Sequence, residues 1–226
     1  MRGEAQQADA RLDRPAVIAC EAVIRILCDV LPGIPTDAAY LFAQTPDNEP
    51  SVTGAATSLM MEAKTRRIMI LDSPSSNGYA GAEKWEGLLN ACGIGRELID
   101  RVPFNARHHN TLTEAEAMLR FAKERDYRSL TVTAPPFHQV RAFMTTVRLG
   151  CQFQLQLKLY SSPGVALDWM QRVVHSQGRL VAERRGLILE ELKRIETYVR
   201  KGDLISLEEV IAYLNRRDLS DYEDRS

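Results

Sequence analysis

The sequence predicts an α/β protein built on a three-layer, mainly parallel sheet. Short apolar runs alternate with amphipathic helical patterns through the middle of the chain, an alternation typical of strands linked by crossover helices. Consecutive runs are not joined by hairpin turns, so their strands should run parallel. We therefore expect a Rossmann-like core over residues 38–163, with an N-terminal segment and one helix over 1–37 and a C-terminal helical extension over 164–226.

Four apolar runs are the predicted strands, at residues 38–43, 67–71, 129–133 and 153–160. The segment 97–102 is ambiguous and reads as a helical turn followed by a short strand, which Pro103 ends. The helices expected between the strands cover residues 52–64, 83–92, 111–125 and 137–149. Each is long enough to carry the chain back across the sheet before the next strand begins.

The N-terminal helix is expected over residues 15–31 and is amphipathic, because Glu21, Arg25 and Asp29 recur on one face. A membrane-spanning helix needs about 20 largely uncharged residues, so we expect no membrane partner. The first residues also lack the apolar core of a signal peptide. These features predict a cytoplasmic protein.

Charge and cysteine content exclude further classes of partner. The chain has 29 Lys and Arg against 30 Asp and Glu, a net charge of −1, which argues against a nucleic-acid partner. Its four cysteines lie far apart and form no CxxC pair. We therefore expect neither a bound metal nor a disulfide framework.

Beyond residue 161 no further strand is evident, and three helices are predicted, at residues 168–176, 178–199 and 206–215. Ser206 and Glu209 have the spacing of a capping box at the start of the last helix. A tail of this length is too short for a core of its own. It should pack on the sheet domain or on a second copy of the chain, in a homodimer formed through these helices. The last residues, 218–226, are expected to fray.

Ligands of an open parallel sheet bind beyond the carboxyl ends of its strands. The loops at those ends, at residues 44–51, 72–80, 105–111 and 134–138, are rich in small and polar residues. Hydroxyls and backbone N–H groups in the loop 72–78 suit an anion ahead of a helix N-terminus, although a solvated turn explains this loop equally well. The sequence contains no GxGxxG and no P-loop motif, which disfavours an ordinary dinucleotide or nucleoside triphosphate site.

Two segments carry polar residues at informative spacing. Thr111 and Glu114 have capping-box spacing, in which the pair satisfies backbone donors at the start of a helix. His138 and Arg141 share one face of the first turn of the helix after strand 129–133. Imidazole and guanidinium there would hold a phosphate or carboxylate, and His138 could transfer a proton. The alternative is a surface histidine beside an arginine in an ion pair.

Together these segments resemble the YdcF/SanA/ElyC family of bacterial proteins. The resemblance rests on Thr-x-x-Glu-Ala opening a helix, Val-Thr-x-Pro ending a strand and His-x-x-Arg-Ala in the next helix. The residues that match by position and spacing are Asn110, Thr111, Thr133, His138 and Arg141. Upstream, Glu83 falls in what looks like the acidic helix of the family. The resemblance covers about residues 38–160 and implies a ligand site at the strand ends.

The chain departs from the family pattern where the backbone usually approaches the ligand. Gly-Gly is usual after the first and second strands, whereas this chain has Gln44-Thr45 and Asp72-Ser73. Glu114 stands where Asn is frequent. These departures imply a ligand different from the family norm or a degenerate site. The chain looks like the soluble branch of the family, one member of which is associated with S-adenosylmethionine binding.

The predicted function is binding of a nucleotide-like or phosphorylated small molecule, with S-adenosylmethionine as one candidate. One rival is an enzyme for phosphoryl or nucleotidyl transfer or hydrolysis that uses His138, and another is a non-catalytic regulator acting through the helical tail. Four residues should converge in one cleft and form the core of the site: Thr111, Thr133, His138 and an exposed Arg141. The full set of candidate binding residues is Gln44, Thr45, Asp72, Ser73, Glu83, Asn110, Thr111, Glu114, Thr133, His138 and Arg141.

Overall fold

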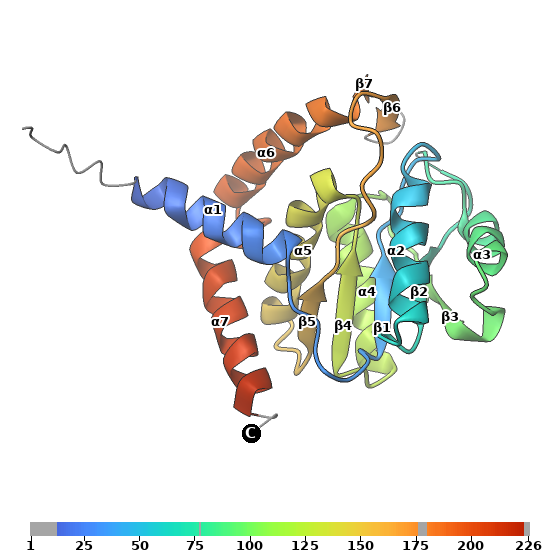
Figure 1. The fold of residues 1–226 in the computed structure, drawn as a ribbon, viewed down its shortest axis with the longest axis horizontal. Helices are drawn as coiled ribbons and strands as arrows, with labels where there is room; N and C mark the ends of the chain where they lie inside the picture. Colours follow the sequence, from blue (N-terminus) through green and yellow to red (C-terminus); the bar gives the residue numbers. More distant parts are fainter. Residues whose placement is uncertain (1–12, 77, 176–179, 224–226) are drawn as a thin grey trace, which may run out of the picture.

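The computed structural model describes residues 13–76, 78–175 and 180–223. At its centre is a five-stranded, all-parallel sheet in the order β3-β2-β1-β4-β5 (Figure 1). The strands are β1 (Ala38–Leu41), β2 (Ile68–Asp72), β3 (Ile99–Pro103), β4 (Ser129–Thr133) and β5 (Lys158–Ser161). A single 3-10 turn precedes β3, as the ambiguous segment suggested. The predicted α/β fold with a parallel sheet is confirmed.

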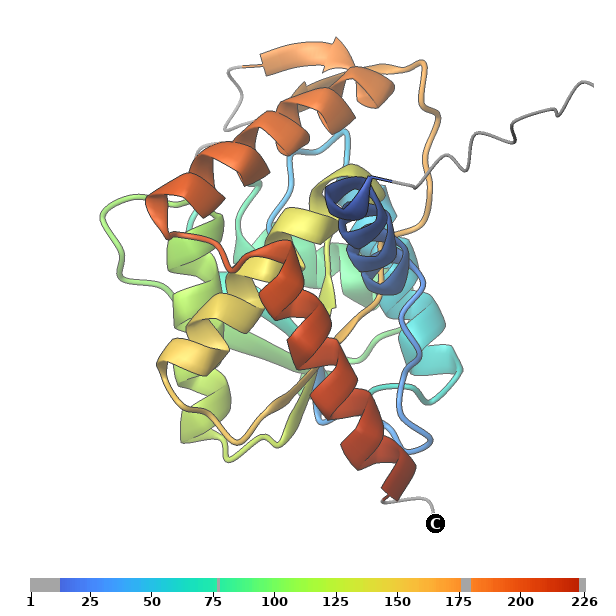
Figure 2. The ribbon, with the colours of Figure 1, turned by 90° about the vertical axis from the view of Figure 1, so that its left-hand side faces the viewer.

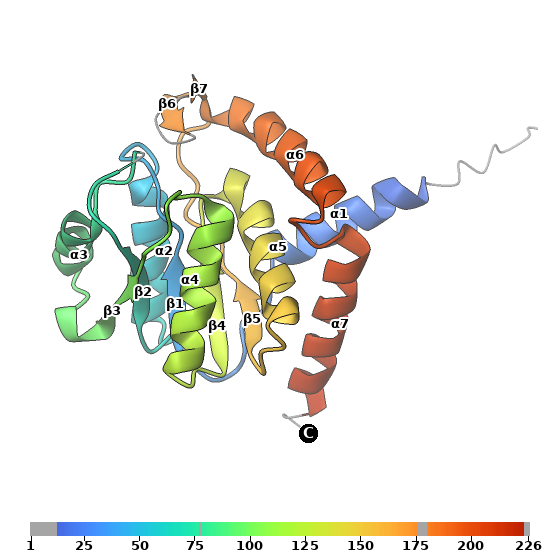
Figure 3. The same ribbon diagram turned by 180° about the vertical axis from the view of Figure 1, so that it is seen from behind.

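Helices cover both faces of the sheet, and the alternation of side chains along β1 shows why. Ala38 and Tyr40 belong to one apolar cluster, beneath α4 (Thr111–Glu124) and α5 (Pro136–Gln152), which cover one face together. Ala39 and Leu41 belong to the other cluster, beneath α2 (Glu49–Met61) and α3 (Ala82–Ala91). Figure 1 shows the sheet from the α2 side and Figure 3 from the α4 side. Because both faces are buried, β1 is apolar throughout and β2 is apolar up to Asp72, without the alternation of a half-exposed strand.

Two terminal helices close the free edge of β5. α1 (Arg14–Leu27) and α7 (Leu207–Glu223) pack on each other and on α5. The Leu159 N–H donates to the Tyr213 hydroxyl and the Leu159 carbonyl accepts from Arg217 Nη1, both at 2.8 Å, while the Ser161 N–H donates to Asp29 at 2.8 Å. An exposed strand edge invites pairing with another chain, and these side chains occupy it. The tail therefore packs on the sheet domain, one of the two placements expected.

The last helix is longer than its pattern suggested. Its predicted capping box is present, since the Ser206 N–H donates to Glu209 Oε2 at 2.9 Å and the Glu209 N–H donates to Ser206 Oγ at 3.2 Å. The helix then runs to Glu223, so the expected fraying of residues 218–223 is wrong. Asp221 explains this, because it pairs with Lys158 at 2.8 Å and holds the end of α7 against β5. Residues 224–226 lie outside the described part of the chain.

The tail is not all helical, contrary to the prediction. β6 (Arg172–His175) and β7 (Leu180–Glu183) form an antiparallel pair and α6 (Arg184–Lys201) follows. The helix predicted over 168–176 is thus wrong, and so is the start of the next, whose residues 178 and 179 lie outside the described residues. Val173 explains the strand, because it is buried with Phe137 of α5 and Leu187 of α6 in a small apolar cluster.

The strand predicted from residue 153 begins later, at Lys158. α5 continues to Gln152, and Gln154 adopts a left-handed conformation with φ of +52°. The Leu155 N–H then donates to the Gly150 carbonyl at 3.1 Å, which is the pairing of a Schellman C-cap. The alternation of Phe and Leu with Gln in this segment resembles a strand, but those side chains pack as the end of a helix and its exit loop.

The strand order reverses between β1 and β4, since β2 and β3 lie on one side of this pair and β5 on the other. A reversal of this kind leaves a crevice at the carboxyl ends of the two central strands. Figures 1 and 2 show α6 and the β6–β7 pair crossing beyond that end of the sheet. Among the described residues, no helix is both long and apolar enough to cross a membrane.

Candidate functional site

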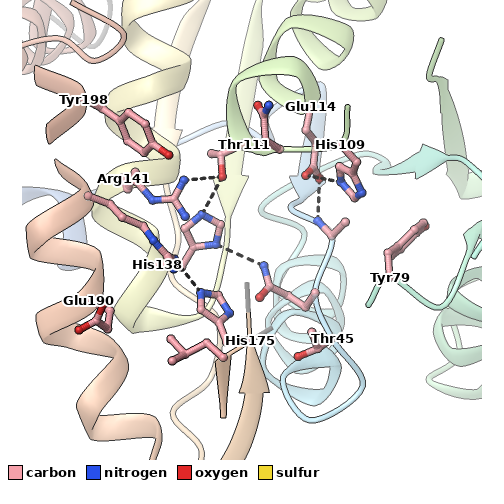
Figure 4. A pocket seen from close by; sticks show the side chains of 15 residues that line it. Thr45, Tyr79, His109, Thr111, Glu114, His138, Arg141, His175, Glu190 and Tyr198 are labelled. Carbon is pink, nitrogen blue, oxygen red and sulfur yellow. Dashed lines mark hydrogen bonds and ion pairs between the residues drawn. The ribbon is translucent and has the colours of Figure 1, made fainter. Parts of the chain in front are cut away.

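A cleft of about 440 Å³ lies between the carboxyl ends of the central strands and α6. Seven of the predicted binding residues line it: Gln44, Thr45, Asn110, Thr111, Glu114, His138 and Arg141. Its other walls include Tyr79 and four groups from the tail, His175, Glu190, Arg194 and Tyr198. Figure 4 shows Thr111 and His138 in the middle of the cleft, with Arg141 and Tyr198 on one side and Tyr79 and His109 on the other.

Three of the four residues expected to converge do so, because α4 and α5 both begin at this end of the sheet. Arg141 Nη1 donates to Thr111 Oγ1 at 2.6 Å. His138 Nε2 lies 3.3 Å from the same Thr111 oxygen. Residues separated by about 30 positions in the chain thus form one hydrogen-bonded group (Figure 4).

Gln44 determines which nitrogen of His138 carries the proton. The amide nitrogen of Gln44 lies 3.2 Å from the Phe42 carbonyl and 3.3 Å from His138 Nδ1, so it donates to both. Nδ1 is then the acceptor, and the proton of the neutral ring is on Nε2, facing Thr111. Burial, and after it the positive charge of Arg141, holds the pKa of His138 well below its ordinary value. His138 is therefore neutral at physiological pH.

The hydroxyl of Thr111 is left as a donor. Its oxygen receives one N–H from Arg141 and one from His138, which uses both lone pairs. No acceptor among the described residues takes the Thr111 proton, and Thr111 lines the cleft. The proton can therefore be offered to an acceptor atom of a ligand. The same geometry opposes a nucleophilic Thr111, because His138 presents a proton to it rather than a lone pair.

Arg141 is buried, so the expectation that it would be exposed is wrong. It is 9% exposed, and its Nε and Nη2 form a two-point contact with the carboxylate of Glu191 in α6. Glu191 also accepts from His175 Nε2 at 3.2 Å and from Arg194 Nη1 at 2.5 Å. Burial would raise the pKa of Glu191, but the charge of Arg141 and the hydrogen bond from His175 outweigh it and hold that pKa well below the ordinary value. Glu191 is therefore ionised.

The start of α4 is capped by a different pair from the one predicted. Asn110 Oδ1 accepts the N–H groups of Leu112 and Thr113 at 2.9 and 3.0 Å, and the Thr113 hydroxyl accepts the Asn110 N–H at 3.2 Å. The capping role expected for Thr111 and Glu114 is therefore wrong. Asn110 and Thr113 do the capping, which leaves Thr111 to face the cleft.

Glu114 turns instead toward β1 and the loop before α4. It accepts from the Tyr40 hydroxyl at 2.9 Å, the Ala43 N–H at 2.6 Å and His109 Nε2 at 3.1 Å. Burial alone would lower the pKa of His109, but the hydrogen bond and charge of Glu114 raise it above its ordinary value. Three donors satisfy this carboxylate, so it positions the wall of the cleft.

An aromatic wall stands at the other end of the cleft. The rings of Tyr79 and His109 meet edge to face with centroids 6.0 Å apart, and Phe104 packs on His109 at 5.3 Å. Tyr79 is fixed by a hydrogen bond from its hydroxyl to the Leu71 carbonyl at 2.9 Å. The cleft thus has an aromatic end, Tyr79 and His109, and a polar end, where Arg141, His175 and Arg194 lie near Thr111 together with the acidic Glu190.

Four predicted residues do not line the cleft. Asp72 lies 3.6 Å from Arg101, the Ser73 hydroxyl donates to the Pro74 carbonyl at 3.1 Å, and Glu83 is exposed at the start of α3. Thr133 is fully buried, and its hydroxyl has no hydrogen-bond partner within the described residues. The structure therefore does not bring these four together with Thr111.

Thr45 lines the cleft but has a structural partner. Its hydroxyl donates to the Val174 carbonyl at 2.6 Å, and the Val174 N–H donates to Asp47 at 2.7 Å. The loop after β1 is thereby tied to β6. The buried guanidinium of Arg184 strengthens this junction by donating to Asn48 Oδ1 at 3.1 Å.

Sequence reasoning missed the residues that the tail contributes to the site. Glu191, Arg194 and Tyr198 recur at helical spacing on one face of α6, which was visible in the sequence. Nothing in the pattern indicated that this face covers the strand ends. Within the described ranges, no three His, Cys, Asp or Glu side chains are grouped to hold a metal ion.

Neither a protein-family model nor a curated protein sequence matches this chain. What the chain does must therefore be inferred from the chemistry of the cleft.

Proposed function

We propose that this chain binds a nucleotide-like or phosphorylated small molecule in the cleft between the strand ends and α6. The observation that carries the proposal is the Thr111 hydroxyl, whose oxygen is occupied by two donors and whose proton is left for a ligand. Arg141, His175 and Arg194 surround it with further N–H donors. Such a group of donors suits the oxygens of a phosphate or carboxylate.

The two ends of the cleft favour a ligand with a planar ring as well as an anionic group. At the end away from Arg141, the ring of His109 is 11% exposed and packs edge to face on the nearly buried Tyr79, so His109 is the ring that a base can contact (Figure 4). A volume of about 440 Å³ falls within the range usual for small-molecule sites. S-adenosylmethionine combines an adenosine with a carboxylate, so it remains one specific candidate, in line with the family resemblance.

An enzyme that uses His138 as a general base has less support. Such a base needs a lone pair directed at the group it deprotonates. The hydrogen bond from Gln44 places the ring proton on the nitrogen that faces Thr111. Binding without this chemistry is therefore the function we favour.

The test compares Thr111→Val with Thr111→Ser by isothermal titration with inorganic phosphate, adenosine monophosphate and S-adenosylmethionine. Valine keeps the shape of threonine but removes its hydroxyl donor. The affinity for whichever of these three ligands binds should therefore fall about tenfold, which corresponds to the loss of one hydrogen bond to a charged group. Serine keeps the hydroxyl and should retain the affinity. The proposal fails if the unaltered protein binds none of the three, or if valine binds as well as serine.

A further inference from the structure

We propose that Glu191 is a built-in competitor for the anionic group of the ligand, so that α6 holds the cleft in a masked state. The inference rests on the proposed function and concerns its regulation. The ligand's phosphate or carboxylate takes over the edge of the Arg141 guanidinium that Glu191 now occupies, and the carboxylate of Glu191 then moves away with its part of α6.

The contact between Glu191 and Arg141 has the form of an anion bound to a receptor. Two nitrogens on one edge of the guanidinium, Nε and Nη2, meet the two carboxylate oxygens. A phosphate makes the same two-point contact with this edge. His175 and Arg194 complete the set of donors around Glu191. The chain thus supplies a carboxylate in a place that suits a ligand anion.

The first half of α6 is held on the core mainly by polar contacts. Its buried residues are Arg184, Leu187 and Glu191, of which Leu187 alone is apolar. On the outer side Leu189 and Leu192 are 58% and 51% exposed. Only the second half, from Ile195, packs against the main apolar cluster. An element with few buried apolar contacts opens at low free-energy cost, so this half of the helix can release the cleft.

A buried ion pair generally contributes little net stability. Replacing such a pair by apolar residues is often neutral or stabilising, because both charges lose their hydration. Glu191 is 1% exposed and links α6 to α5 across a separation of 50 residues. The charge of Glu191 therefore adds little stability that an apolar side chain would not also provide. It does, however, repel any anion that approaches Arg141.

The test replaces Glu191 by Gln, with Glu196→Gln as the matched control. Glu196 lies on the same helix, is exposed and pairs with Arg200, and it does not line the cleft. The glutamine side chain in Glu191→Gln keeps an oxygen to accept from Arg141 but removes the competing charge. Phosphate and adenosine monophosphate should bind Glu191→Gln at least tenfold more tightly than the unaltered protein in titration calorimetry, whereas Glu196→Gln should match the unaltered protein.

A second measurement uses the unaltered protein and so does not depend on how the variant folds. Hydrogen–deuterium exchange in residues 185–194 should become faster when phosphate is added, because displaced Glu191 releases this half of α6. Slower exchange would overturn the inference, since it would mean that the ligand adds to a closed site.

The outcomes separate the two proposals. If Thr111 is needed for phosphate binding but Glu191→Gln binds no more tightly than the unaltered protein, only the masking role fails. If neither protein binds phosphate, adenosine monophosphate or S-adenosylmethionine, both proposals fail. Measurable binding by the unaltered protein together with binding at least tenfold tighter by Glu191→Gln supports both.

Discussion

Thr133 ends β4 with a hydroxyl that is fully buried and has no hydrogen-bond partner among the described residues. A buried hydroxyl without a partner loses its hydration and gains nothing in return. The family resemblance nevertheless includes Thr133 in the ligand site, whereas the structure leaves it outside the cleft. Stability and ligand binding can therefore be separated at this position.

Thr133→Val should stabilise the protein by about 1 kcal/mol, because a methyl group of the same shape replaces an unsatisfied hydroxyl. Urea denaturation measures the change. Ligand affinity should stay the same, since the side chain does not reach the cleft. Reduced affinity in the variant would show instead that Thr133 contacts the ligand, as the resemblance implies.

Two histidines that line the cleft, His138 and His109, respond to pH in opposite directions. Burial and Arg141 hold the pKa of His138 well below its ordinary value. Below about pH 6.5 the unfolded chain takes up a proton here that the folded chain does not. Stability is lost as the pH falls through this range. Glu114 raises the pKa of His109 against the effect of burial. The stability that protonated His109 contributes is therefore fully present below about pH 6.5 and is lost as the pH rises through its folded-state pKa.

The variants His138→Gln and His109→Gln each remove one of these two titrating groups. The free energy of unfolding of the unaltered protein should fall relative to His138→Gln by about 1 kcal/mol per pH unit below pH 6.5. Relative to His109→Gln it should instead fall as the pH rises from 6 to 8. Denaturation series at several pH values measure both differences. Parallel pH profiles for all three proteins would refute the assignment of these shifts.

At the scale of elements, α1 and α7 act together as a cover for the edge strand β5. Arg217 is the centre of this contact: it donates to the Leu159 carbonyl at 2.8 Å and pairs with Asp29 at 2.6 Å. Its side chain and that of Asp29 are 2% and 5% exposed. The charge pair therefore joins the segment that follows the first helix, the last helix and the sheet.

Arg217→Met should destabilise the protein by about 3–5 kcal/mol, because it leaves Asp29 buried without a counter-charge. The double variant Asp29→Asn with Arg217→Met should recover part of that loss. Arg216 is the matched control: it is the exposed neighbour on α7, and Arg216→Met should change stability by less than about 0.5 kcal/mol. Equal losses in chemical denaturation at positions 216 and 217 would contradict the edge-cover account.

On the scale of the whole molecule, the tail is part of the core rather than an appendage. Leu204, Ile205, Val210 and Leu214 are buried in the same apolar cluster as Tyr40 and Phe143. The boundary expected near residue 164 is therefore crossed by tightly packed side chains. Removing the tail would expose one side of that cluster together with the edge of β5.

Deletion of residues 165–226 should make the protein aggregate, because it uncovers apolar surface and an unpaired strand edge at once. Size-exclusion chromatography with light scattering measures this. A milder control is deletion of 222–226, which removes the end of α7 beyond Asp221. A long deletion that remained soluble, monomeric and as stable as the full chain would contradict the packing described.

The sequence by itself determined the class of the fold and the centre of the cleft. Continuous apolar runs identify buried parallel strands, since both faces of each strand need cover. Topology then places Thr111 at the start of one helix and His138 and Arg141 at the start of the next, all at the same end of the sheet. Their convergence needed no knowledge of individual contacts.

Only the tertiary structure decided what covers that cleft. β6 and β7 have four residues each, too few for their pattern to be told from a helix, and their apolar contacts lie in α5 and α6. The partner of Arg141 is 50 residues away, and periodicity cannot indicate which helix face meets which strand end. Arg141 was expected on the surface but forms a buried ion pair with Glu191. The sequence could not indicate this, because Glu191 lies in a part of the chain whose position depends on the whole fold.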